Sequence, residues 1–252
     1  MTIHHKDYWS PNLQPDFKDT AFPNLAHGDA ESAPWGRIEL GVGAGAYSHP
    51  FYCHSNLIPC GYANRDEVAY MQALAKEFSH GAGLEVGCYY AWTTAHFAGF
   101  FERYDVVDPI LSSQERTEIE GSLRAAGVIE SCKLHGGESP QIPVRLYREN
   151  DWKPLWSFAL LDGDHGYPYP EIDAVAVERA MLPTSCIVLH DVYFPPVSAA
   201  LDRLKASGWK TRIVQTTAGV GVAWRGEKTP PVHIPDGNIP WVIPGHLASH
   251  TD

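Results

Sequence analysis

The segment from Gly83 to Thr94 constrains the fold of this chain more than any other. It begins with a short apolar run that ends in Glu85 and Gly87, and a run of small residues that can open a helix follows. A second apolar run, Tyr104–Asp108, also ends in an acid. An α/β domain holds a nucleoside with this order of strand, tight turn, helix and acid-ended strand. The turn lets the backbone approach the ligand, and the acid accepts hydrogen bonds from the ribose hydroxyls.

Apolar runs alternate with helical patterns from residue 65 onward, which predicts a sheet between two layers of helices. Phe158–Leu161 and Cys186–Leu189 are apolar throughout, as expected for parallel strands that are covered on both faces. The linker between the last two predicted strands is too short for a parallel crossover, so these strands must pair antiparallel. The predicted strands are 83–87, 104–108, 130–135, 157–162, 185–190, 210–215 and 219–224, and the predicted helices are 65–78, 92–102, 112–126, 169–181 and 196–207.

The chain divides into three parts by composition. Residues 1–62 are rich in proline, histidine and aromatic residues but carry little periodicity, which indicates an irregular arm that packs on the domain. This arm either covers a site as a lid or simply wraps the domain. Its Gly41–Gly45 run imitates a nucleotide-binding loop, but Pro50 prevents a helix from following it. Residues 63–225 form the domain, and the proline-rich tail 226–252 is expected to be irregular.

The overall charge and the cysteines exclude several classes of protein. A net charge of −11 argues against nucleic acid or an anionic membrane as the main partner. No apolar run is long enough to span a membrane and the N-terminus has no apolar signal core, so we expect a cytoplasmic protein. The five cysteines form no Cys-x-x-Cys pair. We expect Cys88, Cys132 and Cys186, which lie in or beside apolar runs, to be buried and inert thiols.

Acidic and imidazole side chains directly follow three of the predicted strands. They are Asp108, the segment Asp162–His165, and the pair His190 and Asp191. The carboxyl ends of the strands line the ligand crevice of an open α/β sheet, so these side chains should converge on one rim together with Glu85. Each acid taken alone could instead cap the helix that follows it.

Four segments resemble motifs of the class I S-adenosylmethionine-dependent methyltransferases, in the branch of small-molecule O-methyltransferases. Glu85–Thr94 resembles the first motif, which often has the sequence Glu-(Ile/Val)-Gly-Ser-Tyr-x-Gly-x-Ser-Thr, and Leu161–Tyr167 resembles an Asp-Gly-Asp-His-Ser-Tyr segment. Ile187–Asp191 resembles the end of the fifth strand, and Gly219–Ala223 resembles the final strand. The resemblance covers about residues 64–225. It implies a Rossmann-like α/β fold whose seven-stranded sheet is mostly parallel, with the last strand antiparallel and helices on both faces.

The resemblance also implies an enzyme that transfers a methyl group from S-adenosylmethionine to a small molecule, at a hydroxyl oxygen. Glu85 would orient the methionine part of the cofactor, Asp108 would hold the ribose, and Asp162 would close the pocket near the methyl donor. The cofactor-binding residues that the resemblance implies are Glu85, Gly87, Tyr89, Ala91, Thr93, Thr94, Asp108, Pro109, Glu138, Ser139 and Asp162. Ala91 stands where the family usually has glycine, and its extra methyl group is tolerated if the φ angle stays negative.

Methyl transfer to a hydroxyl group requires alignment of the attacking oxygen and removal of its proton. His165 and His190 are candidate bases because a histidine can be neutral near pH 7. Asp164 is an alternative base if a closed pocket raises its pKa. The resemblance offers a divalent metal as a further option, which we do not favour. Its ligands would be Asp162, His190 and Asp191, a set that suits Mn²⁺, Fe²⁺ or Zn²⁺ better than Mg²⁺.

Other functions stay open on the residues alone. An NAD-dependent oxidoreductase shares the first βαβ unit, although the Gly-x-Gly-x-x-Gly spacing is absent after Glu85. Ala91 favours a non-catalytic domain that binds a ligand or a partner, and a metal-dependent hydrolase is a third alternative. Tyr167, Tyr169, Tyr193 and Phe194 either wall an apolar acceptor pocket or pack helices on the sheet. The acceptor and the oligomeric state, including a homo-oligomer, are left open.

Overall fold

The structure is a computed structural model that describes residues 8–22, 63–216, 218–238, 241 and 243–250, and the backbone of two short strands at His27–Gly28 and Phe51–Tyr52. The Gly41–Gly45 run, Cys53, Cys60 and most of the predicted arm therefore lie outside the described residues. The two short strands, β1 (His27–Gly28) and β2 (Phe51–Tyr52), pair antiparallel.

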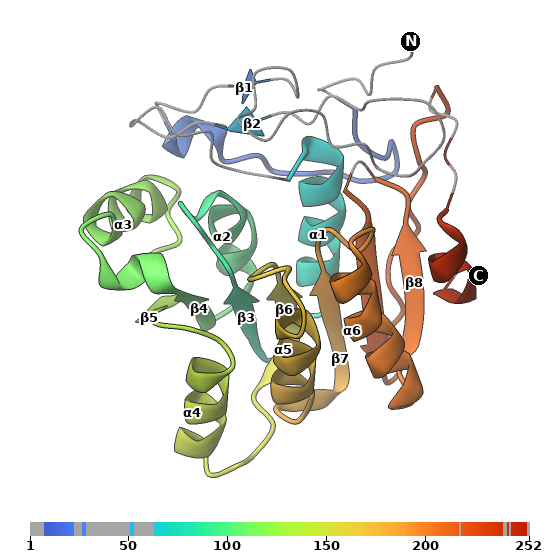
Figure 1. The fold of residues 1–252 in the computed structure, drawn as a ribbon. Helices are drawn as coiled ribbons and strands as arrows, with labels where there is room; N and C mark the ends of the chain where they lie inside the picture. Colours follow the sequence, from blue (N-terminus) through green and yellow to red (C-terminus); the bar gives the residue numbers. More distant parts are fainter. Residues whose placement is uncertain are drawn as a thin grey trace.

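A seven-stranded sheet runs through the domain (Figure 1). Its strands are β3 (Ala82–Val86), β4 (Tyr104–Asp108), β5 (Cys132–Gly136), β6 (Trp156–Leu161), β7 (Met181–Leu189), β8 (Lys210–Val214) and β9 (Val220–Arg225), in the spatial order β5-β4-β3-β6-β7-β9-β8. The strands from β3 to β7 pair in parallel. The last strand, β9, lies between β7 and β8 and runs antiparallel to both. The predicted fold class is confirmed, including the antiparallel last strand.

Helices cover both faces of the sheet. They are α1 (Arg65–Glu77), α2 (Trp92–Phe97), α3 (Arg116–Ala125), α4 (Gln141–Glu149), α5 (Tyr169–Glu178) and α6 (Pro195–Ala206), with short 3-10 helices η1 (Asp19–Ala21), η2 (Ala98–Phe100), η3 (Pro109–Ser112) and η4 (Gly245–His250). Successive residues of β4 show the two layers, since Val106 packs in the core with α1, α2 and α3, and Val107 packs in the core with α4, α5 and α6. None of the helices within the described ranges is both long and apolar enough to cross a membrane.

The structure differs from the predicted elements in three places. Helix α4 was not predicted. Its Pro143 lies in the first turn, where the missing N–H costs no hydrogen bond. The helix predicted over 92–102 ends earlier, with α2 passing into η2. The tail predicted to be irregular contains η4. Cys88, Cys132 and Cys186 are buried free thiols, as expected.

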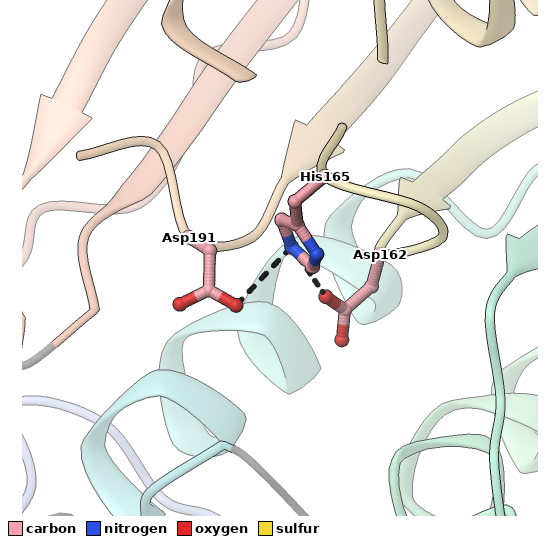
Figure 2. A group of neighbouring side chains, drawn as sticks. All are labelled: Asp162, His165 and Asp191. Atoms are coloured by element: carbon pink, nitrogen blue, oxygen red, sulfur yellow. Dashed lines mark ion pairs between the residues drawn. The ribbon is translucent and has the colours of Figure 1, made fainter. Parts of the chain in front are cut away.

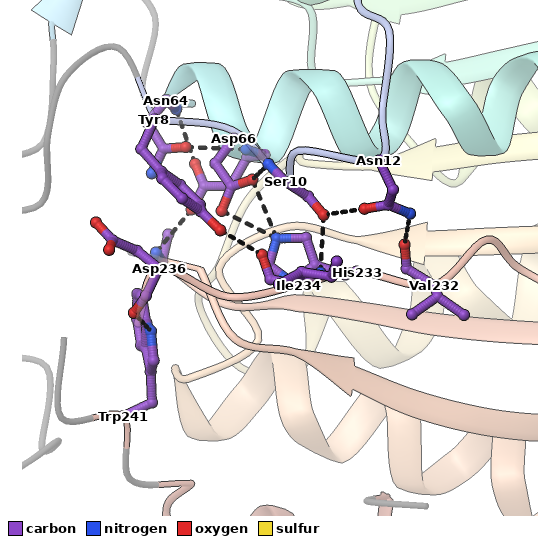
Figure 3. Close-up of polar contacts among 12 residues, drawn as sticks. Tyr8, Ser10, Asn12, Asn64, Asp66, Val232, His233, Ile234, Asp236 and Trp241 are labelled. Atoms are coloured by element: carbon purple, nitrogen blue, oxygen red, sulfur yellow. Dashed lines mark hydrogen bonds and ion pairs between the residues drawn. The ribbon is translucent and has the colours of Figure 1, made fainter. Parts of the chain in front are cut away.

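Two segments that lie far apart in the sequence, residues 8–12 and 232–236, meet at the first turn of α1 (Figure 3). The buried Asp66 carboxylate accepts a hydrogen bond from the Ser10 backbone N–H at 2.9 Å, and His233 Nε2 lies 2.9 Å from its Oδ2. The two segments also contact each other, because the backbone N–H of Ile234 donates to Ser10 Oγ at 2.8 Å and the Tyr8 hydroxyl donates to the Ile234 carbonyl at 2.5 Å. Residues 8–12 and 232–236 are thus held against the start of α1.

The rest of the described N-terminal segment packs on α1 and α2. The backbone N–H of Asp16 donates to Gln72 Oε1 at 2.7 Å, and the backbone N–H of Lys18 donates to His96 Nε2 at 2.9 Å. Burial lowers the pKa of His96 to about 4, so its imidazole is neutral and can accept this bond. Figure 1 shows this segment crossing the molecule on the side towards which the arrows of β3 and β6 point, where the carboxyl ends of these strands lie.

Candidate active site

The carboxyl ends of four neighbouring strands carry the residues that were predicted to converge. The strands lie in the order β4-β3-β6-β7. Asp108 is the last residue of β4, Gly87 follows β3, Asp162 follows β6, and His190 and Asp191 follow β7. The structure therefore places these turns side by side on one edge of the sheet.

Asp108 joins the end of β4 to the turn after β3. Its Oδ2 accepts hydrogen bonds from the backbone N–H groups of Cys88 and Tyr89, both at 2.9 Å, and its Oδ1 accepts one from Ile110 at 2.9 Å. Pro109, the first residue of η3, is exposed. An ionised carboxylate offers about four lone-pair directions, so Asp108 is fixed in orientation and can still accept a further hydrogen bond.

The turn after β3 is made of residues with left-handed backbone angles. Gly87, Tyr89 and Ala91 have φ angles of 84°, 47° and 63°. A side chain at Gly87 would place its Cβ 2.0 Å from the Asp162 carbonyl oxygen, so this position requires glycine. Ala91 therefore does not meet the condition of a negative φ under which its methyl group would be tolerated. Ala91 is the residue before α2, and the chain must turn back there to begin the helix.

Replacing Ala91 by glycine is expected to stabilise the protein by about 1 kcal/mol. The left-handed region costs an L-residue about 1–2 kcal/mol, which exceeds the roughly 0.5–1 kcal/mol of extra backbone entropy that glycine loses on folding. Urea unfolding at fixed pH measures the difference. Ala176→Gly in the last turn of α5 is the control, and it should destabilise by up to about 1 kcal/mol. An Ala91→Gly protein that is less stable than the wild type would contradict the strain assigned to this turn.

Glu85 is a fully buried acid at the end of β3. The Thr93 hydroxyl donates to its Oε1 at 2.5 Å, whereas its Oε2 is buried and has no hydrogen-bond partner among the described residues. Burial raises the pKa of Glu85 to about 8. The hydroxyls of Thr93, Thr94 and Tyr104 oppose this increase, and the charge of Asp162 adds to it. Near neutral pH the side chain is therefore mostly protonated. Thr94, next to Thr93, is buried.

Asp162, His165 and Asp191 form a compact cluster at the ends of β6 and β7 (Figure 2). His165 Nε2 lies 3.5 Å from Asp162 Oδ1 and 3.2 Å from Asp191 Oδ2, and Figure 2 shows the imidazole ring between the two carboxylates. One ligand atom from each of the three residues lies within 4.8 Å of the others, so the group could hold a metal ion. His165 is about one-third exposed, which leaves it accessible from outside.

His190 lies beneath this cluster and is fully buried. Its Nδ1 lies 3.2 Å from Asp162 Oδ1 and 3.3 Å from Asp191 Oδ2, and its Nε2 lies 3.2 Å from Glu67 Oε2. The group that could hold a metal contains His165 and not the predicted ligand His190. Both nitrogens of the His190 ring already face carboxylates inside the protein. Asp164 does not join the cluster. It is exposed, and its Oδ1 accepts a hydrogen bond from the Gly166 backbone N–H at 2.7 Å.

The carboxylates control the protonation of both histidines. Burial alone would lower the pKa of His165, but Asp162 and Asp191 outweigh it and raise this pKa to about 10. The same two carboxylates raise the pKa of His190 well above its usual range against the effect of burial. Burial would raise the pKa of Asp191, but the charges and hydrogen bonds of the two histidines lower it. Both imidazoles therefore carry a proton at neutral pH, unlike the neutral histidines that were expected.

One of the four aromatic residues singled out in the sequence packs beside the His165 ring. The ring of Phe194 lies 5.8 Å from the His165 ring, centroid to centroid. Phe194, Tyr167 and Tyr169 are exposed. Tyr193 is buried and packs on Gly219, where no side chain would fit. Three of the four aromatic residues singled out in the sequence thus reach the surface near His165 or its loop, and the fourth packs in the core.

No protein-family model matches the sequence, and no curated protein matches it either. Solved structures do resemble the fold. An O-methyltransferase from Bacillus cereus in complex with S-adenosylhomocysteine (SAH) superposes with a TM-score of 0.57 at 13% identity, over 67% of this chain and 84% of that chain. The O-methyltransferase TomG from Streptomyces achromogenes, in complex with S-adenosylmethionine, gives 0.51 at 17% identity, over 62% and 78%. A precorrin-6y C5,15-methyltransferase from Geobacter metallireducens gives 0.52 at 16% identity, over 70% and 94%.

This chain has the class I methyltransferase fold. The similarity covers about two-thirds of the chain at low identity, so it shows the fold alone. What the site does depends on the residues that this chain places there. Within the methyltransferase fold, the loop after β5 carries two of the predicted cofactor residues. Glu138 is exposed, whereas the Ser139 hydroxyl donates to Asp173 Oδ1 at 2.6 Å.

Sequence analysis of this methyltransferase-fold chain did not single out Glu67 or Asp173. Asp173 lies on α5, and burial raises its pKa to about 6. Glu67 lies in the first turn of α1 and contacts His190. The one signal for Glu67 is the Asn-x-x-Glu spacing from Asn64, a capping box that the structure contains. That pattern indicates the start of a helix and says nothing about a contact with β7.

Proposed function

We propose that this protein transfers a methyl group from S-adenosylmethionine to a hydroxyl oxygen of a small molecule. The observation that carries this proposal is the shared edge of the sheet. There the acid expected to bind ribose, Asp108, and a cluster that can accept a proton, Asp162, His165 and Asp191, follow neighbouring strands. The class I methyltransferase fold supports the choice of cofactor, and some of the similar structures carry S-adenosylmethionine or SAH.

The residues along this edge fit the cofactor chemically. Glu85 Oε2, a buried oxygen without a partner among the described residues, suits the ammonium group of the methionine part. Asp108 suits the ribose hydroxyls, because its carboxylate is held in place and can accept one more hydrogen bond. The positive φ angles of Gly87, Tyr89 and Ala91 expose backbone to the ligand, and Thr93, Thr94, Glu138, Ser139 and Asp162 complete the proposed contacts.

When bound, S-adenosylmethionine supplies a sulfonium methyl group that is already activated for attack by an oxygen. We assign the removal of the hydroxyl proton to His165, because it is the accessible imidazole of the cluster. Its Nε2 is buried against Asp162 and Asp191. The acceptor hydroxyl would therefore give its proton to the other ring nitrogen, Nδ1, after the charged imidazole has lost a proton. His190 is fully buried and is assigned to holding these two carboxylates, and Asp164 has no part in the proton transfer. Phe194, Tyr167 and Tyr169 form the proposed apolar wall for the acceptor.

Asp162, His165 and Asp191 also fit a divalent cation, which remains a second option for the same site. Two carboxylate oxygens and one imidazole nitrogen suit Mn²⁺, Fe²⁺ or Zn²⁺ better than Mg²⁺. Such a cation would supply Lewis-acid polarisation of the acceptor hydroxyl. Metal binding would compete with protonation of His165, because a histidine ligand must be neutral.

Isothermal titration tests the cofactor directly. The wild-type protein is expected to bind SAH and not NAD. Asp108→Asn should weaken SAH binding by about 1–3 kcal/mol, because one carboxylate oxygen becomes an amide group that cannot accept a hydrogen bond from ribose. Asp151→Asn, a change at an exposed residue of the α4–β6 connection, is the control. Preference of the wild type for NAD, or equal SAH affinity in Asp108→Asn, would refute the assigned cofactor site.

A further inference from the structure

Glu67 connects the start of α1 to two other parts of the active-site edge. It is fully buried. Its Oε2 accepts a hydrogen bond from the Asn64 backbone N–H at 2.8 Å, and its Oε1 accepts one from the Ala218 backbone N–H, between β8 and β9, at 2.8 Å. Its Oε2 also lies 3.2 Å from His190 Nε2 at the end of β7.

The contact with His190 extends to the proposed catalytic cluster. Glu67 holds one nitrogen of the His190 ring, and the other nitrogen lies 3.2 Å from Asp162 and 3.3 Å from Asp191. A ring held at both nitrogens cannot turn without breaking contacts on both sides. The orientation of His190 therefore fixes the two carboxylates that flank His165.

Helix capping alone does not account for an acid at this position. A capping box is satisfied equally well by glutamine in place of glutamate. A buried carboxylate costs several kcal/mol in desolvation unless it is paired, so the charge of Glu67 needs a partner that capping does not supply. His190 is such a partner. The adjacent Asp66 is fixed by Ser10 and His233, so the turn that carries Glu67 is itself anchored.

We propose that Glu67 is a positioning residue of the active site. It orients His190, and through His190 it sets the positions of Asp162 and Asp191 around His165. Glu67 itself touches neither the cofactor nor the acceptor. This inference rests on the proposed methyl transfer for its functional meaning, but the geometry that it predicts can be tested without a substrate.

The test uses the full-length protein with ¹⁵N-labelled histidine. In Glu67→Gln one accepting oxygen remains, so the side chain can keep the hydrogen bond from either Asn64 or Ala218, while the charge that faces His190 is lost. The ring ¹⁵N signals of both His190 and His165 are expected to shift, because Glu67 contacts His190 and His190 contacts the two carboxylates that flank His165. The affinity for SAH should stay within about twofold, because the cofactor contacts are unchanged. Glu77→Gln, an exposed residue at the end of the same helix, is the matched control and should leave both signals in place.

A second variant separates positioning from a general loss of structure. His190→Asn cuts the same connection on its other side and should shift the His165 signals in the same way. The double variant should add little to either single change, because residues that act through one contact are not additive. With an acceptor found by screening phenols, sugars and aliphatic alcohols, Glu67→Gln should lower kcat by about 10- to 100-fold, with little change in KM.

The outcomes distinguish the two proposals. Unchanged His165 signals in folded Glu67→Gln and His190→Asn proteins would overturn the positioning role. So would additive effects in the double variant. If the His165 signals shift as expected but the wild type does not bind SAH, the positioning role stands and the proposed methyl transfer fails.

Discussion

Replacing His165 by alanine is expected to lower the rate of methyl transfer by about 10²- to 10⁴-fold, the usual contribution of a general base. His165 is the accessible imidazole between Asp162 and Asp191, so no other side chain of the cluster can replace it as a proton acceptor in the same position. Release of SAH with the best acceptor from a screen of hydroxyl compounds measures the rate. His246→Ala, in the exposed part of the C-terminal tail, is the control and should behave as the wild type.

The pH dependence of the wild-type rate provides a second readout for His165. The two carboxylates raise the pKa of His165 to about 10, so the base form is scarce at neutral pH and increases with pH. The rate should therefore rise by up to about tenfold per pH unit above pH 7 and level off near the pKa of the complex. His165→Ala should lose this dependence. A wild-type rate that is flat between pH 7 and 9 would assign the proton transfer to another group.

Replacing Glu85 by glutamine is expected to stabilise the free protein and to weaken cofactor binding. Burial raises the pKa of Glu85 from 4.5 to about 8. Between these values the unfolded chain loses the proton while the folded protein keeps it. This acid therefore lowers the stability of the folded state as pH rises from about 4.5, and the full loss is reached above pH 8. Each pKa unit corresponds to about 1.4 kcal/mol, so the expected gain for Glu85→Gln at pH 8 is several kcal/mol.

Cofactor binding should change in the opposite direction. Glutamine can still accept the hydrogen bond from Thr93, but it carries no charge for the ammonium group of the cofactor. Hydrogen bonds to charged groups contribute about 1.5–3 kcal/mol, so the affinity for SAH should fall by about 10- to 150-fold. In the wild type this affinity should rise with pH towards 8, because binding requires the ionised carboxylate.

Urea unfolding at pH 5 and pH 8 and titration calorimetry with SAH measure the two effects of Glu85→Gln. The gain in stability should be larger at pH 8 than at pH 5. Glu130→Gln, at an exposed residue, is the control and should change neither quantity appreciably. A destabilised Glu85→Gln protein at pH 8 would show that the buried carboxyl is paired in a way that the structure does not contain.

Part of the active-site edge could be predicted because it depends on local sequence. Asp108, Asp162 and Asp191 directly follow apolar runs, and those runs become neighbouring strands whose carboxyl ends meet. The start of α1 at Arg65 was also predicted correctly, since its cap involves only Asn64 and Glu67, three residues apart.

Backbone angles and helix starts were less predictable. A negative φ at Ala91 was stated only as a condition, and alanine rarely adopts the left-handed region. The connection between β3 and α2 imposes a φ of 63°, and packing around the residue outweighs the local preference. Helix α4 was not predicted, although Ile142 and Leu146, four residues apart, are both buried on it.

The sequence by itself determined the order of the strands along the chain and the edge of the sheet at which acids and histidines gather. It also contains the motifs that resemble the methyltransferase family. These follow from apolar runs, turn residues and spacing along the chain. Only the tertiary structure decided which histidine faces outward and which is enclosed. His190 meets Glu67 across 123 positions of sequence, and such a contact exists only after α1 has packed against the end of β7. The protonation of both histidines depends on that packing, because the carboxylates that stabilise their charge come from separate strands and turns.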